Sequence, residues 1–121
     1  MPACFWKGLL FLRNADIIEN KGVLAFDLTA HEILWETPVE KALVCTAPYG
    51  GKAQTVESTL VLDGDTLVFG ASDGNLYRIF AADGSVLQTV AIGAPIFGKA
   101  ANADGEWIVG DFAGRVSRVK L

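Results

Sequence analysis

The sequence predicts an all-β fold built from short antiparallel strands joined by tight turns. About half of the 121 residues are apolar and 13 are glycine, which is the composition of a folded domain with many turns. Asp-Gly pairs, the dipeptides favoured in two-residue hairpin turns, recur between short apolar runs. Few runs of strong helix formers interrupt this pattern.

The clearest hairpins lie in the middle of the chain. Residues 67–70 form a short apolar strand, and Asp73-Gly74 follows as a turn. Residues 75–80 return as a strand rich in β-forming side chains. Asp83-Gly84 turns the chain again, and residues 85–90 run out as a further strand. These residues therefore predict a meander of three antiparallel strands.

The hairpin pattern repeats toward the carboxyl end of the chain. Residues 107–119 reproduce the strand, turn and strand of residues 67–79 forty positions later. Asp104-Gly105 echoes Asp63-Gly64 at a spacing of forty-one. Such internal self-similarity is the sequence signature of a repeat architecture.

An earlier copy of the repeat precedes a polar insertion. Residues 22–35 match residues 74–88 at a displacement of fifty-two or fifty-three, and a Gly-rich insertion around residues 48–55 accounts for the extra length. A four-stranded unit of about forty residues is the period of a β-propeller blade. The predicted fold is therefore a partial β-propeller of about three four-stranded antiparallel blades.

The period divides residues 1–121, a single partial domain, into blades of approximately residues 2–41, 42–93 and 94–121, the last ending after its third strand. A propeller ring needs at least four blades. Three incomplete blades leave apolar end faces uncovered. We therefore expect the chain to be the C-terminal part of a longer polypeptide, and we expect copies to associate through the open blade faces.

Charge and cysteine content narrow the classes of partner. The net charge of −4 argues against a nucleic-acid partner, which needs a basic stripe. The apolar start of the chain is broken by Lys7 and is far shorter than the ~20 residues of a membrane span, so we interpret it as a core strand. Cys4 and Cys45 are too few for a disulfide scaffold; two free thiols are favoured over one bridge, and the compartment stays open.

One segment fits the G-x-S-x-G pattern of serine hydrolases, at residues 70–74. A nucleophile elbow requires a helix after this turn, whereas the sequence predicts a strand. The single histidine, His31, precedes Ser72, opposite to the order in α/β-hydrolases. We therefore expect a turn in which Ser72 and Asp73 bond their own backbone, and no catalytic residue.

Two further segments resemble ligand sites incompletely. Residues 93–100 nearly match a phosphate-binding loop, but Ala100 lacks the hydroxyl that would hold magnesium. We expect a crossover between blades, with Lys99 in solvent. Asp63-Gly64-Asp65 begins like a calcium loop whose twelfth position is Gly74 instead of glutamate. Since His31 alone makes no metal site, we predict no metal or cofactor site.

Propeller geometry predicts where a partner would bind. With the strands of a blade labelled A to D, the B-to-C turns and the D-to-A crossovers share one rim of the ring. This rim comprises residues 14–21, 72–75 and 112–115 and the crossovers near Glu40 and Gly93. From it we predict Asp73, Asn75 and Arg115 as residues that contact a protein partner.

The segment of residues 68–77 resembles the repeat of the PQQ-like (quinoprotein alcohol dehydrogenase-like) propellers. The likeness lies in an apolar strand ending in glycine, then Ser-Asp-Gly, then Leu-Tyr. Residues 24–27 and 33–35 supply the later half of the repeat, ending in Trp35. Two positions depart from the family pattern: Gln88 replaces the blade-packing tryptophan, and His31 replaces the turn glycine.

The resemblance implies a module without a cofactor. Quinone-dependent dehydrogenases of this superfamily hold the quinone with calcium, acidic ligands, a stacking tryptophan and commonly a disulfide between adjacent cysteines. Cys4 and Cys45 are not adjacent, and no acid-rich segment is present. The implied function is non-catalytic protein interaction or scaffolding in a larger bacterial protein, such as a secreted or periplasmic phosphoesterase. The alternative is a remnant of a quinone-dependent dehydrogenase.

Overall fold

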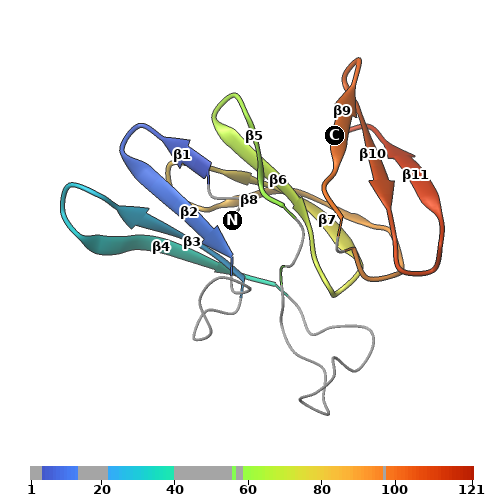
Figure 1. Cartoon of the computed structure of the whole chain (residues 1–121), viewed down its shortest axis with the longest axis horizontal. Helices are drawn as coiled ribbons and strands as arrows, with labels where there is room; N and C mark the ends of the chain where they lie inside the picture. Colours follow the sequence, from blue (N-terminus) through green and yellow to red (C-terminus); the bar gives the residue numbers. More distant parts are fainter. Residues whose placement is uncertain (1–3, 14–21, 40–55, 57–58, 97) are drawn as a thin grey trace, which may run out of the picture.

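The computed structural model describes residues 4–13, 22–39, 56, 59–96 and 98–121. These residues form eleven β-strands in three antiparallel sheets, and the described part of the chain contains no helix. Figure 1 shows the sheets side by side in chain order, as consecutive blades. The predicted all-β partial propeller with an incomplete last blade is confirmed.

Each sheet is an up-and-down meander in chain order. Blade 1 contains β1 (Cys4–Trp6), β2 (Leu9–Arg13), β3 (Gly22–Asp27) and β4 (Glu32–Pro38). Blade 2 contains β5 (Val61–Asp63), β6 (Thr66–Gly70), β7 (Asn75–Phe80) and β8 (Val86–Ala91). Blade 3 contains β9 (Ala101–Ala103), β10 (Glu106–Gly110) and β11 (Val116–Val119). The exact blade borders between these sheets stay a prediction.

The Asp-Gly turns form as predicted at one site and are longer at two others. Asp104 and Gly105 both have positive φ, 52° and 84°, as a two-residue hairpin turn requires. The turns at Asp73 and Asp83 are longer, since they span residues 71–74 and 81–85, and in each the aspartate side chain accepts a hydrogen bond from the backbone N–H two residues on, at 2.9 Å. The prediction of two-residue turns at these two sites was therefore wrong.

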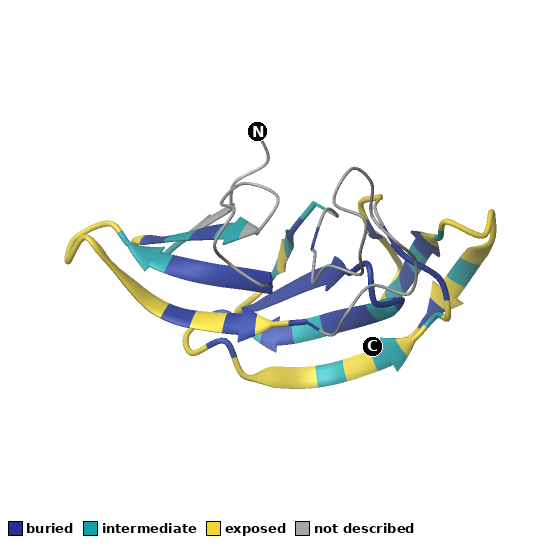
Figure 2. Cartoon of the chain, turned by 90° about the horizontal axis from the view of Figure 1, so that it is seen from below, coloured by how far each residue is buried: buried dark blue, intermediate teal, exposed yellow. Residues whose placement is uncertain are grey.

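Apolar side chains fill two cores, one on each side of blade 2. Between blades 1 and 2, Phe11 and Trp35 pack with Phe69 in a cluster of fully or largely buried residues. Between blades 2 and 3, Val68 packs with Trp107 in a second cluster. Each fully buried large apolar side chain contributes about 1.5–3 kcal/mol. Figure 2 shows the buried residues along the strands that face a neighbouring sheet.

Candidate interaction surfaces

Blade 1 is attached to blade 2 through a tryptophan on its last strand. The Trp35 Nε1–H donates to the carbonyl oxygen of Ala81 at 3.0 Å. The indole ring lies directly over Gly84, where a Cβ atom would come within 2.4 Å of Trp35 Cε3. The turn of blade 2 therefore needs glycine at this position to receive the ring.

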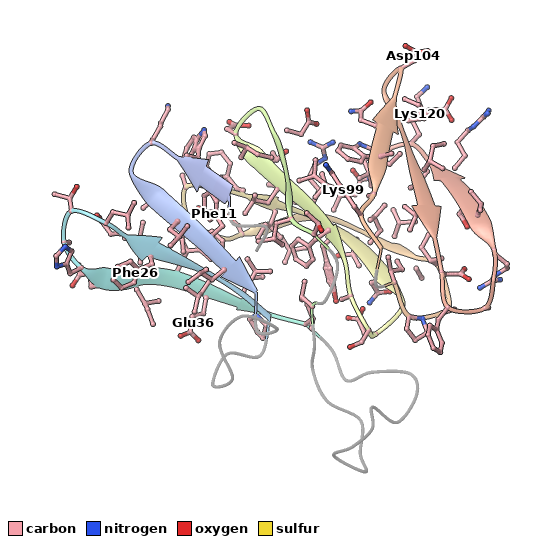
Figure 3. All side chains as sticks on the ribbon, viewed as in Figure 1. Phe11, Phe26, Glu36, Lys99, Asp104 and Lys120 are labelled. Atoms are coloured by element: carbon pink, nitrogen blue, oxygen red, sulfur yellow. The ribbon has the colours of Figure 1, made fainter. Side chains whose placement is uncertain are left out.

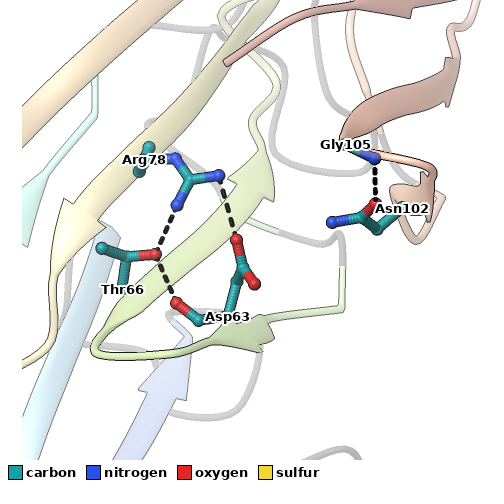
Figure 4. Close-up of polar contacts among 5 residues, drawn as sticks. All are labelled: Asp63, Thr66, Arg78, Asn102 and Gly105. Atoms are coloured by element: carbon teal, nitrogen blue, oxygen red, sulfur yellow. Dashed lines mark hydrogen bonds and ion pairs between the residues drawn. The ribbon is translucent and has the colours of Figure 1, made fainter.

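Blade 2 is attached to blade 3 through an arginine. Arg78 donates from Nη1 to Thr66 Oγ1 at 2.7 Å and from Nη2 to Asp63 Oδ2 at 3.1 Å (Figure 4). The Cζ atom of Arg78 lies 5.9 Å from the centroid of the Trp107 ring, within the range of a cation–π contact. Residues of blade 2 thus fix the guanidinium, and an aromatic ring of blade 3 covers it.

Blade 3 repeats the covered face of blade 2 but leaves it open. Strand register places Ile108, Gly110, Val116 and Arg118 at the positions that Val68, Gly70, Leu76 and Arg78 hold in blade 2. We call these four residues of blade 3 its outer face. Val116 is 77% exposed, whereas Leu76 is fully buried. The Arg118 side chain is 72% exposed, against 18% for Arg78.

Blade 1 has a corresponding open face at the other end of the array. Leu10, Leu12, Leu24 and Phe26, the outer face of blade 1, occupy the positions of Leu67, Phe69, Tyr77 and Ile79. The blade 2 residues are buried against blade 1, whereas in blade 1 Leu24 is buried and Leu10, Leu12 and Phe26 are only half-buried. In Figure 3, Phe11 lies on the side of blade 2 and Phe26 on the opposite side. The two end blades are thus each covered on one face.

The predicted rim is continuous across blades 2 and 3. The crossover between β8 and β9 bonds the β6–β7 turn, since the Ile92 N–H donates to Gly74 O at 2.8 Å. It also bonds the β10–β11 turn, since the Phe112 N–H donates to Pro95 O at 2.8 Å. The other predicted parts of the rim, residues 14–21 and the crossover near Glu40, lie outside the described residues.

The three predicted contact residues lie on this rim with different exposure. Asp73 is buried, and its carboxylate accepts hydrogen bonds from the Asn75 N–H and from the Tyr77 hydroxyl, both in blade 2. Asn75 is half-buried. Arg115 is exposed and donates from Nη2 to Ile92 O at 3.1 Å. Their role in binding a partner stays a prediction.

The most exposed aromatic residue of the rim is Phe112, at 68%. Phe11, Phe69 and Trp107 are buried between the blades, whereas Phe112 is exposed. Its place in the turn between Gly110 and Gly114 was the available signal. Phe112 and Arg115 are the exposed residues of this part of the rim with large side chains, and Ala113 and Gly114 between them are exposed as well.

A buried carboxylate holds the β10–β11 turn. Asp111 accepts hydrogen bonds from the backbone N–H groups of Ala113 and Arg115 at 2.9 and 3.1 Å, and its Oδ2 lies 3.2 Å from Arg115 Nε. Burial by itself would raise the pKa of the Asp111 carboxyl group. The hydrogen bonds and the Arg115 charge outweigh burial, so the pKa lies below the usual value for aspartate.

The segments that resemble catalytic or ligand sites lie in turns and a crossover. Ser72 is buried, and strand β7 follows its turn, as predicted. Lys99 is exposed in the crossover, and strand β9 follows. His31 lies in the β3–β4 turn with a φ of 58°. Asp63 bonds Arg78.

The described residues offer neither a metal site nor a membrane-spanning helix. Among the described residues, no three histidine, cysteine, aspartate or glutamate side chains gather into a group that would hold a metal ion. Cys45 lies outside the described residues, so its pairing with Cys4 stays open. The part of the chain that the structure describes holds no helix with the length and apolarity to cross a bilayer.

Comparison with known proteins identifies the fold but no sequence family. No family model and no curated protein sequence matches the chain. Among solved structures, BamB from Moraxella catarrhalis aligns with a TM-score of 0.75 at 15% identity, over 97% of this chain and 35% of that one. The Swd1 β-propeller domain of Myceliophteria thermophila aligns at 0.63 and 16% identity, over 98% and 35%.

A computationally designed protein, Ika4, also aligns, with a TM-score of 0.65 and 13% identity over 98% of this chain and 64% of that one. The chain therefore spans about a third of the length of the two natural proteins and under two thirds of the designed one. At these identities the likeness establishes a β-propeller fold.

Proposed function

We propose that this chain is a non-catalytic PQQ-like β-propeller segment that serves as a protein-interaction or scaffold module within a larger ring. The observation that carries the proposal is the contrast between the blades. Blade 2 is covered on both faces, whereas blade 1 and blade 3 are each open on the face that points away from blade 2. Blades in a propeller bury their faces against neighbours. The open faces are therefore where further blades or another copy attach.

The assignment to the PQQ-like type rests on the docking tryptophan and the blade 2 turn. Trp35 packs on the glycine of the next blade, at the position where the repeat of that family places its tryptophan. The Ser-Asp-Gly turn places Asp73 against Tyr77, which links two residues of the repeat. In blade 2, Gln88 replaces the tryptophan of this contact, and in blade 1, His31 replaces the glycine, so the contact is not repeated at these positions.

The proposed module acts as part of a larger bacterial protein, such as a secreted or periplasmic hydrolase. Its partners are the remaining blades of that protein, a second copy of the chain, and a protein that binds the rim at Arg115 and Phe112. The rim contact belongs to the proposal because these side chains are exposed and the turn beneath them is fixed by Asp111.

Self-association of the isolated chain tests the proposal. We expect sedimentation velocity to show reversible association that increases with concentration. Phe26→Glu places a charge on the outer face of blade 1, and Val116→Glu places one on that of blade 3; each is expected to yield monomers. Val86→Glu, at a half-exposed position on β8, is the matched control and should leave association unchanged.

Mixing the two variants separates a head-to-tail contact from a symmetric one. In a head-to-tail contact, the open face of blade 1 of one copy meets that of blade 3 of another. The Phe26→Glu variant then keeps the open face of blade 3 intact, and the Val116→Glu variant keeps that of blade 1. These two faces bind each other, so the mixture forms dimers and nothing larger. A wild-type chain that stays a compact, stable monomer at all concentrations would contradict the proposal.

A further inference from the structure

We propose that the outer face of blade 3 is a docking site for one further propeller blade with a defined chemistry. The linker that precedes this blade places a β-branched apolar side chain beside Gly110, and its second strand places an aromatic ring over Arg118. The inference rests on one part of the proposed function, namely that a larger ring continues beyond blade 3.

The contact of blade 2 with its linker provides the template. A Cβ atom on Gly70 would lie 2.2 Å from Ile96 Cγ2, so the side chain of Ile96 occupies the space beside this glycine. Ile96 is fully buried, and its N–H donates to Ala71 O at 3.0 Å. It belongs to the crossover between β8 and β9. Glycine at position 70 thus lets the linker approach the strand closely.

Gly110 holds the same position in blade 3 without an occupant. It pairs with Val116 as Gly70 pairs with Leu76. A Cβ atom on Gly110 would meet no described residue within 4 Å, and its φ is not in the left-handed region. Neither crowding within the chain nor backbone conformation accounts for glycine here. The close approach of a linker side chain, as at Gly70, does account for it.

Arg118 repeats the arrangement of Arg78 and lacks its cover. Its Nε lies 3.6 Å from Glu106 Oε2, so blade 3 holds the guanidinium with its own carboxylate as blade 2 does with Asp63. The aromatic ring that covers Arg78 has no counterpart over Arg118 among the described residues, and the side chain is 72% exposed. An aromatic ring over Arg118 completes the same cation–π contact.

The turn next to this face is open in the same way. Phe112 stands at the position of Ser72 in the β6–β7 turn. Ser72 is fully buried, whereas Phe112 is 68% exposed. A linker over Gly110 that followed the path of the β8–β9 crossover would therefore cover Phe112 as well. The uncovered surface is continuous from the face of the sheet to its turn.

A second copy of this chain fits the site less well than a blade with these features. If blade 1 of another copy docked there, Leu10 would occupy the position of Trp107, as the pairs Leu10↔Phe26 and Trp107↔Val119 show. Leucine supplies no ring for the guanidinium of Arg118. We therefore commit to a further blade with an aromatic side chain at this position.

The test supplies such a blade from the chain itself. A second copy of residues 80–121 replaces Lys120 and Leu121, which continues the register because Val119 holds the position of Ile79. The full chain and the extended chain each carry Val116→Cys, and thiol labelling is measured by peptide mass at a concentration where the full chain is monomeric. We expect labelling at position 116 to be at least ten-fold slower in the extended chain.

Matched variants show whether the site itself is responsible. Leu34→Cys, half-exposed on blade 1, should label equally fast in both chains. Ile96→Asp made only in the added copy should restore fast labelling at position 116, whereas Ile96→Val there should not. Gly110→Val should also restore fast labelling, because its side chain fills the space that the linker residue needs.

Three results would overturn the inference. The first is equal labelling of position 116 in both chains. The second is protection of position 34 in the extended chain as strong as that of position 116. The third is protection of position 116 that persists with Ile96→Asp in the added copy. Concentration-dependent protection of position 116 in the unextended chain, equal to that of the extended one, would identify a second copy as the occupant and overturn it too. Because labelling uses monomers, the failure of self-association leaves this test intact.

Discussion

Single glycines control how closely the blades approach. Gly84 has a φ of 75° and lies beneath the Trp35 ring, so it satisfies a backbone and a packing requirement at once. Gly64 has a similar φ of 63°, but within the described part of the chain a Cβ atom there would meet nothing within 4 Å. The two positions therefore separate the cost of the backbone conformation from the cost of crowding.

We expect Gly84→Ala to lower the free energy of unfolding by about 2–5 kcal/mol. The left-handed backbone costs about 1–2 kcal/mol, and overlap with Trp35 adds about 1–3 kcal/mol. The control Gly64→Ala should lose only the backbone part. Urea unfolding measures both, and equal losses would show that Trp35 does not press on this turn.

Asp111 makes stability depend on pH in the acid range. Its pKa is lower in the folded than in the unfolded chain, so its contribution is fully present above the unfolded value and is lost as pH falls through the folded one. We expect Asp111→Asn to be less stable than wild type at pH 7 and to lose less stability between about pH 5 and pH 2. Parallel pH profiles of the two proteins would contradict this role.

The strands were largely predictable, because their signals are local. The expected strand of residues 75–80 coincides with β7, and that of residues 85–90 is one residue from β8. Turn dipeptides and alternating side chains mark these boundaries within a few residues. The lengths of the turns were not predictable, because an Asp-Gly pair is compatible with two-residue turns and with the longer turns that contain Asp73 and Asp83.

The site was less predictable than the strands, because exposure depends on contacts between blades. The sequence placed Asp73 and Arg115 on one rim, but only the packing of the turn shows that Asp73 is buried and Arg115 exposed. Likewise, the forty-residue repeat aligns Arg78 with Arg118 but does not show which has a neighbour. Trp107 makes the difference, and it comes from another blade.

These two arginines provide a matched pair for the contact between blades 2 and 3. We expect Arg78→Ala to lower the free energy of unfolding by about 1–3 kcal/mol, because it removes charged hydrogen bonds and the contact with Trp107. Arg118→Ala removes an exposed ion pair and should cost under about 1 kcal/mol. Thermal or urea unfolding distinguishes them; equal costs would remove Arg78 from the interface.

For the whole molecule, the response to added quinone and calcium distinguishes a scaffold from a quinone enzyme. A quinone-binding remnant requires acidic ligands and calcium near the ring axis. We expect added quinone with calcium to cause no quinone absorbance on the protein and no rise in thermal midpoint. A clear thermal shift with quinone and calcium, but with neither alone, would favour the dehydrogenase alternative over the scaffold.

The tryptophan contact of blade 1 has a consequence for the order of assembly. His31 holds the place in the β3–β4 turn that Gly84 holds in blade 2, with a similar positive φ and an N–H bonded to the same relative carbonyl. An indole ring from an earlier unit would meet the imidazole side chain where Trp35 meets only backbone. The array therefore has a direction. A tryptophan contact of this kind forms on the turn of blade 2, whereas the imidazole side chain prevents it on the turn of blade 1.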